Sequence, residues 1–180
     1  MSKNKKHSKT KWIITITTLA FIISFVFSLI SEITLSKVGL ILGIVILLLF
    51  IGIGIIFDMI GVAVTAGTES PLNAMSSKKL KGAKKAVSFK KNADKVSSFC
   101  NDVIGDICGI ISGSAGVTIT ADISKTYNLD IFWVGLVITA IVASLTIGGK
   151  ALCKGIAMKK SKEIVYFTAK IISIFERKKK

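Results

Sequence analysis

The chain has 180 residues, of which 51% are hydrophobic and only one is proline, and its formal net charge is +15. Long uncharged runs exclude an ordinary soluble domain, so the lysines are expected to set membrane topology rather than to bind nucleic acid. The sequence holds no Cys/His zinc pattern, no P-loop and no hydrolase motif, and an enzyme is therefore not expected.

Four apolar stretches predict an all-α, polytopic integral membrane protein with four transmembrane helices. They cover residues 12–30, 38–66, 96–121 and 131–149, and each is close to or longer than the ~20 residues that cross a bilayer. The first follows a basic tail, residues 1–11, as a signal peptide would. Its apolar core is long and no A-x-A-type cleavage site follows it, so we interpret it as a retained, extra N-terminal helix.

The distribution of lysines predicts the side of each connection. The N-terminal tail, the long loop between the second and third stretches and the C-terminal region are strongly basic, whereas residues 31–37 and 122–130 are near neutral or acidic. Because basic connections remain on the cytoplasmic side, both termini and the long loop are expected there. The chain is thus expected to be a multi-pass protein of the cytoplasmic membrane.

Two basic segments, residues 72–94 and 155–176, predict juxtamembrane helices. Apolar residues recur among the lysines of the first segment, and in the second they share one helical face at Ile164, Phe167, Ile171 and Phe175. These patterns favour a basic amphipathic helical hairpin against the anionic lipids of the inner leaflet. The alternative is a solvated run of charge that only sets topology.

Ionisable residues inside the apolar stretches are candidates for function, because a charge is costly in hydrocarbon. Asp58 directly follows a long apolar run. Asp102 and Asp106 are four residues apart and Ser98 is four before Asp102, so the three share one helical face. Carboxylate and hydroxyl oxygens are the ligands that Mg²⁺ and Ca²⁺ prefer. The alternative for Ser98 and Asp102 is a position in headgroup water at the cytoplasmic end of the span.

A glycine pattern in the third stretch predicts close helix packing. Gly105, Gly109 and Gly113 form two overlapping G-x-x-x-G motifs. Small residues at this spacing let helix backbones approach each other in lipid. The contact is expected either within the bundle or across a homodimer.

Three segments in order carry a family resemblance: TAGTESPLNAMSSKKLKGAKKA, KNADKVSSFCNDVIGDI and GGKALCKGIAMKKSKEIV. The first contains Thr68 and Glu69 in an Ala-Gly-Thr-Glu sequence, the second contains Asn101, and the third begins with a glycine pair and Lys150. Together they resemble the transmembrane domain of the cyclin M (CNNM) and CorB/CorC magnesium transporters. The resemblance implies a three-span domain over residues 38–180, to which the helix at 12–30 is extra.

In that family the similar domain is a homodimer, and each protomer holds a dehydrated Mg²⁺ with hydroxyl, amide, backbone and carboxylate oxygens. The resemblance implies ligands here near Thr68, Ser98, Asn101 and the carbonyls of Gly148 and Gly149. The i, i+4 spacing of Asp102 and Asp106 described above adds their two carboxylates to this candidate metal site. Mg²⁺, as a transported or bound ion, is the one expected cofactor. The family's paired nucleotide-binding (CBS) modules do not follow the spans in this sequence, so a separate cytoplasmic regulatory protein is an expected partner.

Lys150 is where the sequence departs from the family, which has a carboxylate at this position. A protonated ammonium has no lone pair to offer a metal. Either it occupies the place of the cation and pairs with Asp102 or Asp106, or it reaches the inner headgroups and the carboxylates hold the ion alone. Glu69 and Asp58 are the other candidates for an internal counter-ion or switch.

The leading function is a membrane-embedded divalent-cation (Mg²⁺-type) transporter domain or a close derivative of one. The first alternative is a structural or regulatory membrane protein that transports nothing and in which Lys150 replaces the bound cation. The second is a small holin-like pore former, which only size and charge favour.

Overall fold

The computed structural model describes residues 39–177 and, nearer the N-terminus, Ile14, 17–18, 20–26, 28–31 and Ile33, with side chains as far as Ile174. The described residues are helical apart from short turns and include no strand, which confirms the all-α prediction. Three of their helices are long and apolar enough to cross a membrane. Between Ala20 and Ser31 a shorter apolar helix is described, but the rest of the 12–30 stretch and the basic tail lie outside the described residues. The fourth span therefore stays a prediction.

The first long helix, α2 (Leu40–Ala66), is unbroken although its 27 residues exceed the thickness of a bilayer core. Near its C-terminal end the carbonyls of Val64 and Thr65 accept hydrogen bonds from Lys90 Nζ, at 3.0 and 2.8 Å. A cation is favoured there because helix carbonyls lack intrahelical partners and carry the negative end of the helix dipole. The basic loop is thus attached to the end of α2.

The second long apolar rod runs from Ala93 to Tyr127 through three consecutive elements. They are α5 (Ala93–Ser98), the π-helical segment η1 (Phe99–Gly105) and α6 (Asp106–Tyr127). The rod ends at Asn128, whose φ of 54° is left-handed, a conformation that asparagine tolerates better than most residues. The predicted span at 96–121 lies entirely within this rod.

The third long helix, α7 (Ile131–Lys159), begins at a side-chain cap. The Asp130 carboxylate accepts a hydrogen bond from the Phe132 amide at 2.8 Å, as N-cap residues do. The helix continues to Lys159, past residue 149, where the predicted span ends. Alanine, leucine, lysine and methionine follow the glycine pair, and these residues favour helix.

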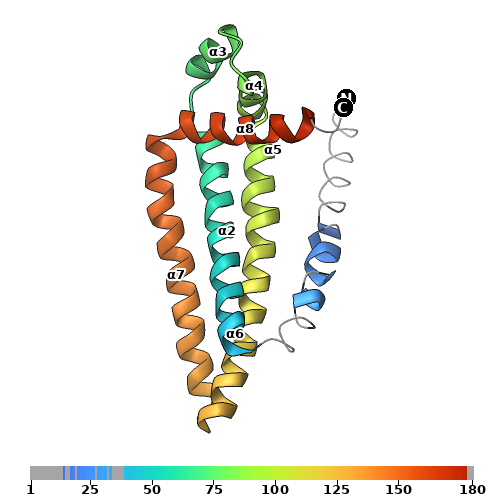
Figure 1. Ribbon diagram of the computed structural model, residues 1–180, viewed down its shortest axis with the longest axis vertical. Helices are drawn as coiled ribbons and strands as arrows, with labels where there is room; N and C mark the ends of the chain where they lie inside the picture. Colours follow the sequence, from blue (N-terminus) through green and yellow to red (C-terminus); the bar gives the residue numbers. More distant parts are fainter. Residues whose placement is uncertain are drawn as a thin grey trace, which may run out of the picture.

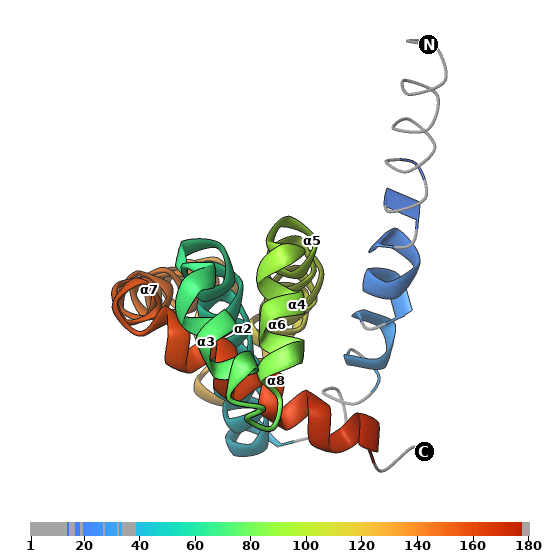
Figure 2. The same cartoon turned by 90° about the horizontal axis from the view of Figure 1, so that it is seen from above.

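Helix α2 lies between α6 and α7 in both views of the bundle (Figures 1 and 2). Leu47 and Ile51 of α2 form a buried cluster with Ala115 and Ile119 of α6. The glycines of the G-x-x-x-G pattern do not make this contact: a Cβ built on Gly109 or Gly113 would meet no atom within 4 Å in the described chain. The alternative of packing within the bundle is therefore wrong for these two glycines, and the homodimer alternative stays a prediction.

A layer of short helices covers one end of the bundle. Helix α8 (Ser161–Arg177) crosses that end, and α3 (Glu69–Ser77) and α4 (Ala83–Lys91) lie beyond it (Figure 1). The layer is fixed to the spans by one buried apolar cluster, made of Ala63, Val64, Leu72, Ala86, Ala157, Val165 and Ala169. Helices therefore occupy both predicted juxtamembrane segments, although the first is divided into α3 and α4 by a turn. The side of the membrane on which they lie stays a prediction.

Gly82 allows the α3–α4 turn to reach α8. Its φ is +84°, and an added Cβ would lie 2.7 Å from Lys170 Cα and 3.0 Å from Lys170 N. We expect Gly82→Ala to lower the free energy of unfolding by roughly 1–3 kcal/mol, because a left-handed non-glycine residue is strained and the backbone of α8 cannot rotate away. The measurement is thermal unfolding of the detergent-purified chain. Gly155→Ala is the control, since a Cβ at Gly155 would meet nothing within 4 Å, and equal effects of the two changes would contradict the prediction.

Candidate functional site

Charged residues from all three long helical rods lie at one depth in the bundle. At a rise of ~1.5 Å per residue, Asp58 is ~12 Å from the end of α2 nearest α8. Asp102 and Lys150 are each ~14 Å from the corresponding ends of their rods. Residues far apart in the sequence thus meet in one layer, within helices that are otherwise apolar enough to cross a membrane.

Lys150 forms an ion pair with Asp58. Its Nζ lies 3.8 Å from Asp58 Oδ1, and the two side chains are 38% and 20% exposed. The expected partners of Lys150 were Asp102 and Asp106. Its ion-pair partner in the structure is instead Asp58 of α2. Sequence spacing could not find this partner, because it depends on how α7 is rotated against α2.

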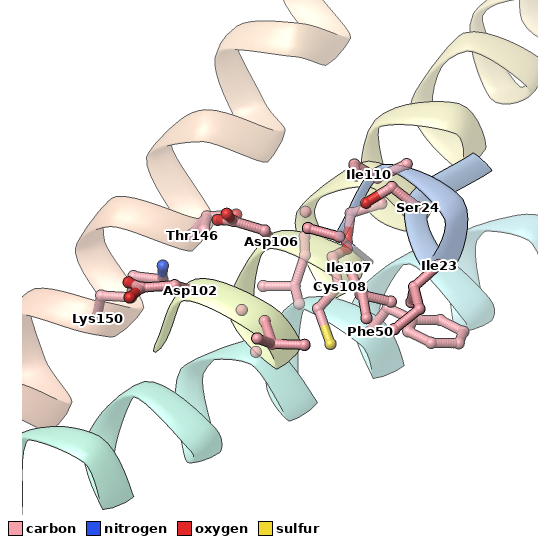
Figure 3. Close-up of a pocket in the computed structure, with 17 residues that line it drawn as sticks. Ile23, Ser24, Phe50, Asp102, Asp106, Ile107, Cys108, Ile110, Thr146 and Lys150 are labelled. Carbon is pink, nitrogen blue, oxygen red and sulfur yellow. The ribbon is translucent and has the colours of Figure 1, made fainter. Parts of the chain in front are cut away.

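A cavity of about 480 Å³ opens beside this ion pair. Asp102, Asp106, Thr146 and Lys150 line it, and Figure 3 shows both carboxylates on the side of the cavity where the α7 residues lie. The remainder of the wall comes from apolar and small side chains of α2, α6 and the described N-terminal residues, among them Phe50, Cys108, Ala20 and Ile23. The expectation that Asp102 and Asp106 share a face holds geometrically, since both reach one cavity.

Three hydroxyls, which the sequence analysis did not single out, add oxygen atoms to the cavity: those of Ser24, Ser112 and Thr146. Ser112 donates its proton to the Cys108 carbonyl at 2.6 Å, and Thr146 donates to the Val142 carbonyl at 2.8 Å. Because the protons of Ser112 and Thr146 are used by the helix backbone, the lone pairs of these two oxygens remain available as acceptors. Thr146 is four residues before Lys150, and that i, i+4 spacing was the signal that could have placed it on the lysine's face.

The π-helical segment η1 carries Asp102 and the neighbouring Asn101. Single π turns inside α-helices are uncommon and often occur at functional sites. Asn101 does not line the cavity: it packs against α2, where a Cβ on Gly61 would overlap Asn101 Oδ1 and lie 2.8 Å from its Cγ. Its Nδ2 donates to Ser97 Oγ at 3.3 Å, while its buried Oδ1 has no hydrogen-bond partner among the described residues.

The other predicted ligands lie elsewhere. Ser98 is exposed on α5, and Thr68 and Glu69 are exposed at the junction of α2 and α3; none of them lines the cavity. The structure therefore brings together Asp102, Asp106 and Lys150, with Asp58 as the lysine's partner, and leaves the other proposed ligands outside.

The glycine pair does not offer free carbonyls. Gly148 and Gly149 lie inside α7, where each carbonyl faces the amide four residues ahead. The expectation that these carbonyls are approachable is wrong, since the helix does not break. Gly149 instead makes room for the side chain of Ile55 on α2, because a Cβ at residue 149 would overlap Ile55 Cδ1.

Within the described residues, no group of three or more His, Cys, Asp or Glu side chains is arranged to hold a metal ion. Any cation in the cavity would be bound by two carboxylates, hydroxyls and water. Comparison of the chain with family models, curated proteins and solved structures finds no match.

Proposed function

We propose that the chain is a membrane-embedded divalent-cation transporter domain of Mg²⁺ type, or a close derivative of one. One observation carries the proposal: among the described residues, three carboxylates and a single ammonium line or adjoin one cavity inside an apolar bundle. With all four groups ionised, two negative charges are left over. A divalent cation is the ligand that balances them.

The physical argument is the cost of isolated charge in a medium of low polarity. An unpaired carboxylate among apolar helices is strongly disfavoured, so it must be neutralised by a proton or by a cation. Asp102, Asp106, Ser112 and Thr146 supply only oxygen atoms to the cavity. Mg²⁺ prefers oxygen ligands and usually retains several waters, and 480 Å³ leaves space for waters of ~30 Å³ each.

The family resemblance supports the same function. It adds a homodimeric assembly, a separate cytoplasmic regulatory protein and the cytoplasmic membrane as the location, all of which are part of this proposal. The alternation of basic and neutral connections supports cytoplasmic termini.

A non-transporting protein is the second candidate, and the Lys150–Asp58 ion pair favours it. Lys150 stands where the family has a carboxylate, and its ammonium already neutralises one carboxylate of the layer. In this candidate the ion pair holds α7 against α2, and the two remaining aspartates are hydrated.

The deciding experiment is Mg²⁺ binding to the detergent-purified full chain by calorimetry. We expect saturable binding by the unmodified chain, weakened at least about tenfold in Asp102→Asn/Asp106→Asn, because the double change removes both cavity carboxylates. Asp94→Asn/Asp122→Asn is the matched control: it removes the same charge from two aspartates that do not line the cavity. Binding by the control should be unchanged, and Mg²⁺ flux into proteoliposomes should fall only in the first variant.

Absence of saturable binding by the unmodified chain, with binding gained in Lys150→Glu, would overturn the transporter proposal and support the non-transporting candidate. Binding without flux would also overturn the transporter proposal, and it would show that the chain holds the ion without moving it.

A further inference from the structure

Helix α8 has two apolar faces, and only one of them is used by the fold. Val165 and Ala169 are buried in the cluster that fixes α8 to the end of the bundle. Phe167, Ile171 and Ile174 are exposed, and their spacing of four and three residues makes them a stripe on a second face. A helix of this kind at the end of a membrane bundle has an apolar surface that remains to be covered.

This second face forms one wall of a groove. Where α8 crosses the end of the bundle (Figure 1), a groove of about 870 Å³ lies between α2, α7 and α8. Its apolar walls include Ile56 and Ile60 of α2, Ile156 of α7, and Ile164, Phe167 and Ile171 of α8. The volume lies within the ~300–1,000 Å³ typical of small-molecule and cofactor sites.

The rim of the groove is basic. Lys160 and Lys162, at the junction of α7 and α8, line it together with Glu163. Lys162 Nζ lies 4.0 Å from Glu163 Oε1, and Lys160 forms no ion pair with the described residues. An apolar interior with a cationic rim, at the end of a membrane-spanning helix, complements a molecule with a hydrocarbon chain and an anionic headgroup.

We propose that this groove binds an anionic phospholipid, with an acyl chain against α2 beneath α8 and the phosphate at Lys160 and Lys162. The inference is independent of cation transport, because none of these groove residues lines the aspartate cavity. The lipid covers Phe167 and Ile171, the part of the second face that lines the groove, and joins the short-helix layer to the bilayer.

The headgroup contact is tested by native mass spectrometry of the full chain in detergent, with phosphatidylglycerol or phosphatidylcholine added. We expect Lys160→Gln/Lys162→Gln to reduce phosphatidylglycerol binding about tenfold, since each lysine near an anionic headgroup contributes a substantial electrostatic attraction. Lys78→Gln/Lys84→Gln removes the same charge from exposed positions outside the groove and should retain the lipid. Equal losses in the two variants, or equal binding of both lipids by the unmodified chain, would overturn the proposal.

The acyl contact is tested separately with Phe167→Ser, against Ile174→Ser as its control. Both side chains are exposed on α8, but only Phe167 lines the groove, so neither change should unfold the chain. We expect phosphatidylglycerol retention to fall in Phe167→Ser alone. If Phe167→Ser instead shifts the monomer–dimer ratio and leaves the lipid bound, a second copy of the chain covers this face and the proposal is wrong.

Discussion

Replacing Lys150 by methionine is expected to lower the free energy of unfolding of the purified chain by about 2–4 kcal/mol. The change leaves Asp58 without its partner at 3.8 Å, and it removes the ammonium that lines the cavity together with Asp102 and Asp106. Removing one member of a buried ion pair typically costs ~3–5 kcal/mol. The smaller figure applies here because the Lys150 side chain is 38% exposed.

The same substitution one turn further along α7 provides the control. Lys154 is exposed and does not line the aspartate cavity, so Lys154→Met should change the free energy of unfolding by less than about 0.5 kcal/mol. The double change Asp58→Asn/Lys150→Met should lower the free energy of unfolding by less than the sum of the two single changes, because both members of the pair are removed together. Strict additivity would show that the ion pair contributes nothing.

Substitution of Gly61 by alanine is the second change for which we expect a large effect. An added Cβ would overlap the Asn101 amide, so Asn101 must leave its site or η1 must move away from α2. Overpacking of this kind typically costs ~1–3 kcal/mol, and it would also displace the neighbouring Asp102. We therefore expect lower thermal stability together with weaker Mg²⁺ binding.

Gly52→Ala is the matched control for this prediction. Gly52 lies on the same helix, and a Cβ there would meet no atom within 4 Å, so stability and binding should be unchanged. Gly61→Ala/Asn101→Ala should recover stability relative to Gly61→Ala, because the smaller side chain makes room for the added methyl group. Failure of the double change to recover would mean that the contact with Asn101 is not the cause of the loss.

Both predictions concern places where polar groups enter an apolar bundle. Such groups are costly in lipid and require partners, and the partners come from other helices. Asp58 of α2 is such a partner for Lys150 of α7. Gly61 of α2 leaves space for the polar side chain of Asn101, because a glycine has no Cβ. The candidate site and the stability of the bundle therefore depend on the same few residues.

The class of protein and the approximate ends of its helices could be predicted from the sequence because these properties are local. Apolar runs long enough to span a bilayer need only composition and length. Asp130 and Asn128 mark a helix start and a helix end through their own side chains and backbone preferences. The third span was predicted to end at a glycine pair, but the helix formers that follow continue α7 to Lys159.

The candidate site could be predicted only in part, because a site depends on how helices are rotated and displaced against each other. Spacing within a single helix predicted that Asp102 and Asp106 share one face. The same kind of spacing on α7 could have placed Thr146 on the face of Lys150. It could not pair Lys150 with Asp58 or direct Asn101 toward Gly61, since these partners lie on helices whose mutual orientation no local pattern encodes. The amino-acid sequence by itself determined that the chain is all-α and that its helices are long and apolar enough to span a membrane. Only the tertiary structure, through side-chain packing between helices, decided which charges meet and which glycines make space for them.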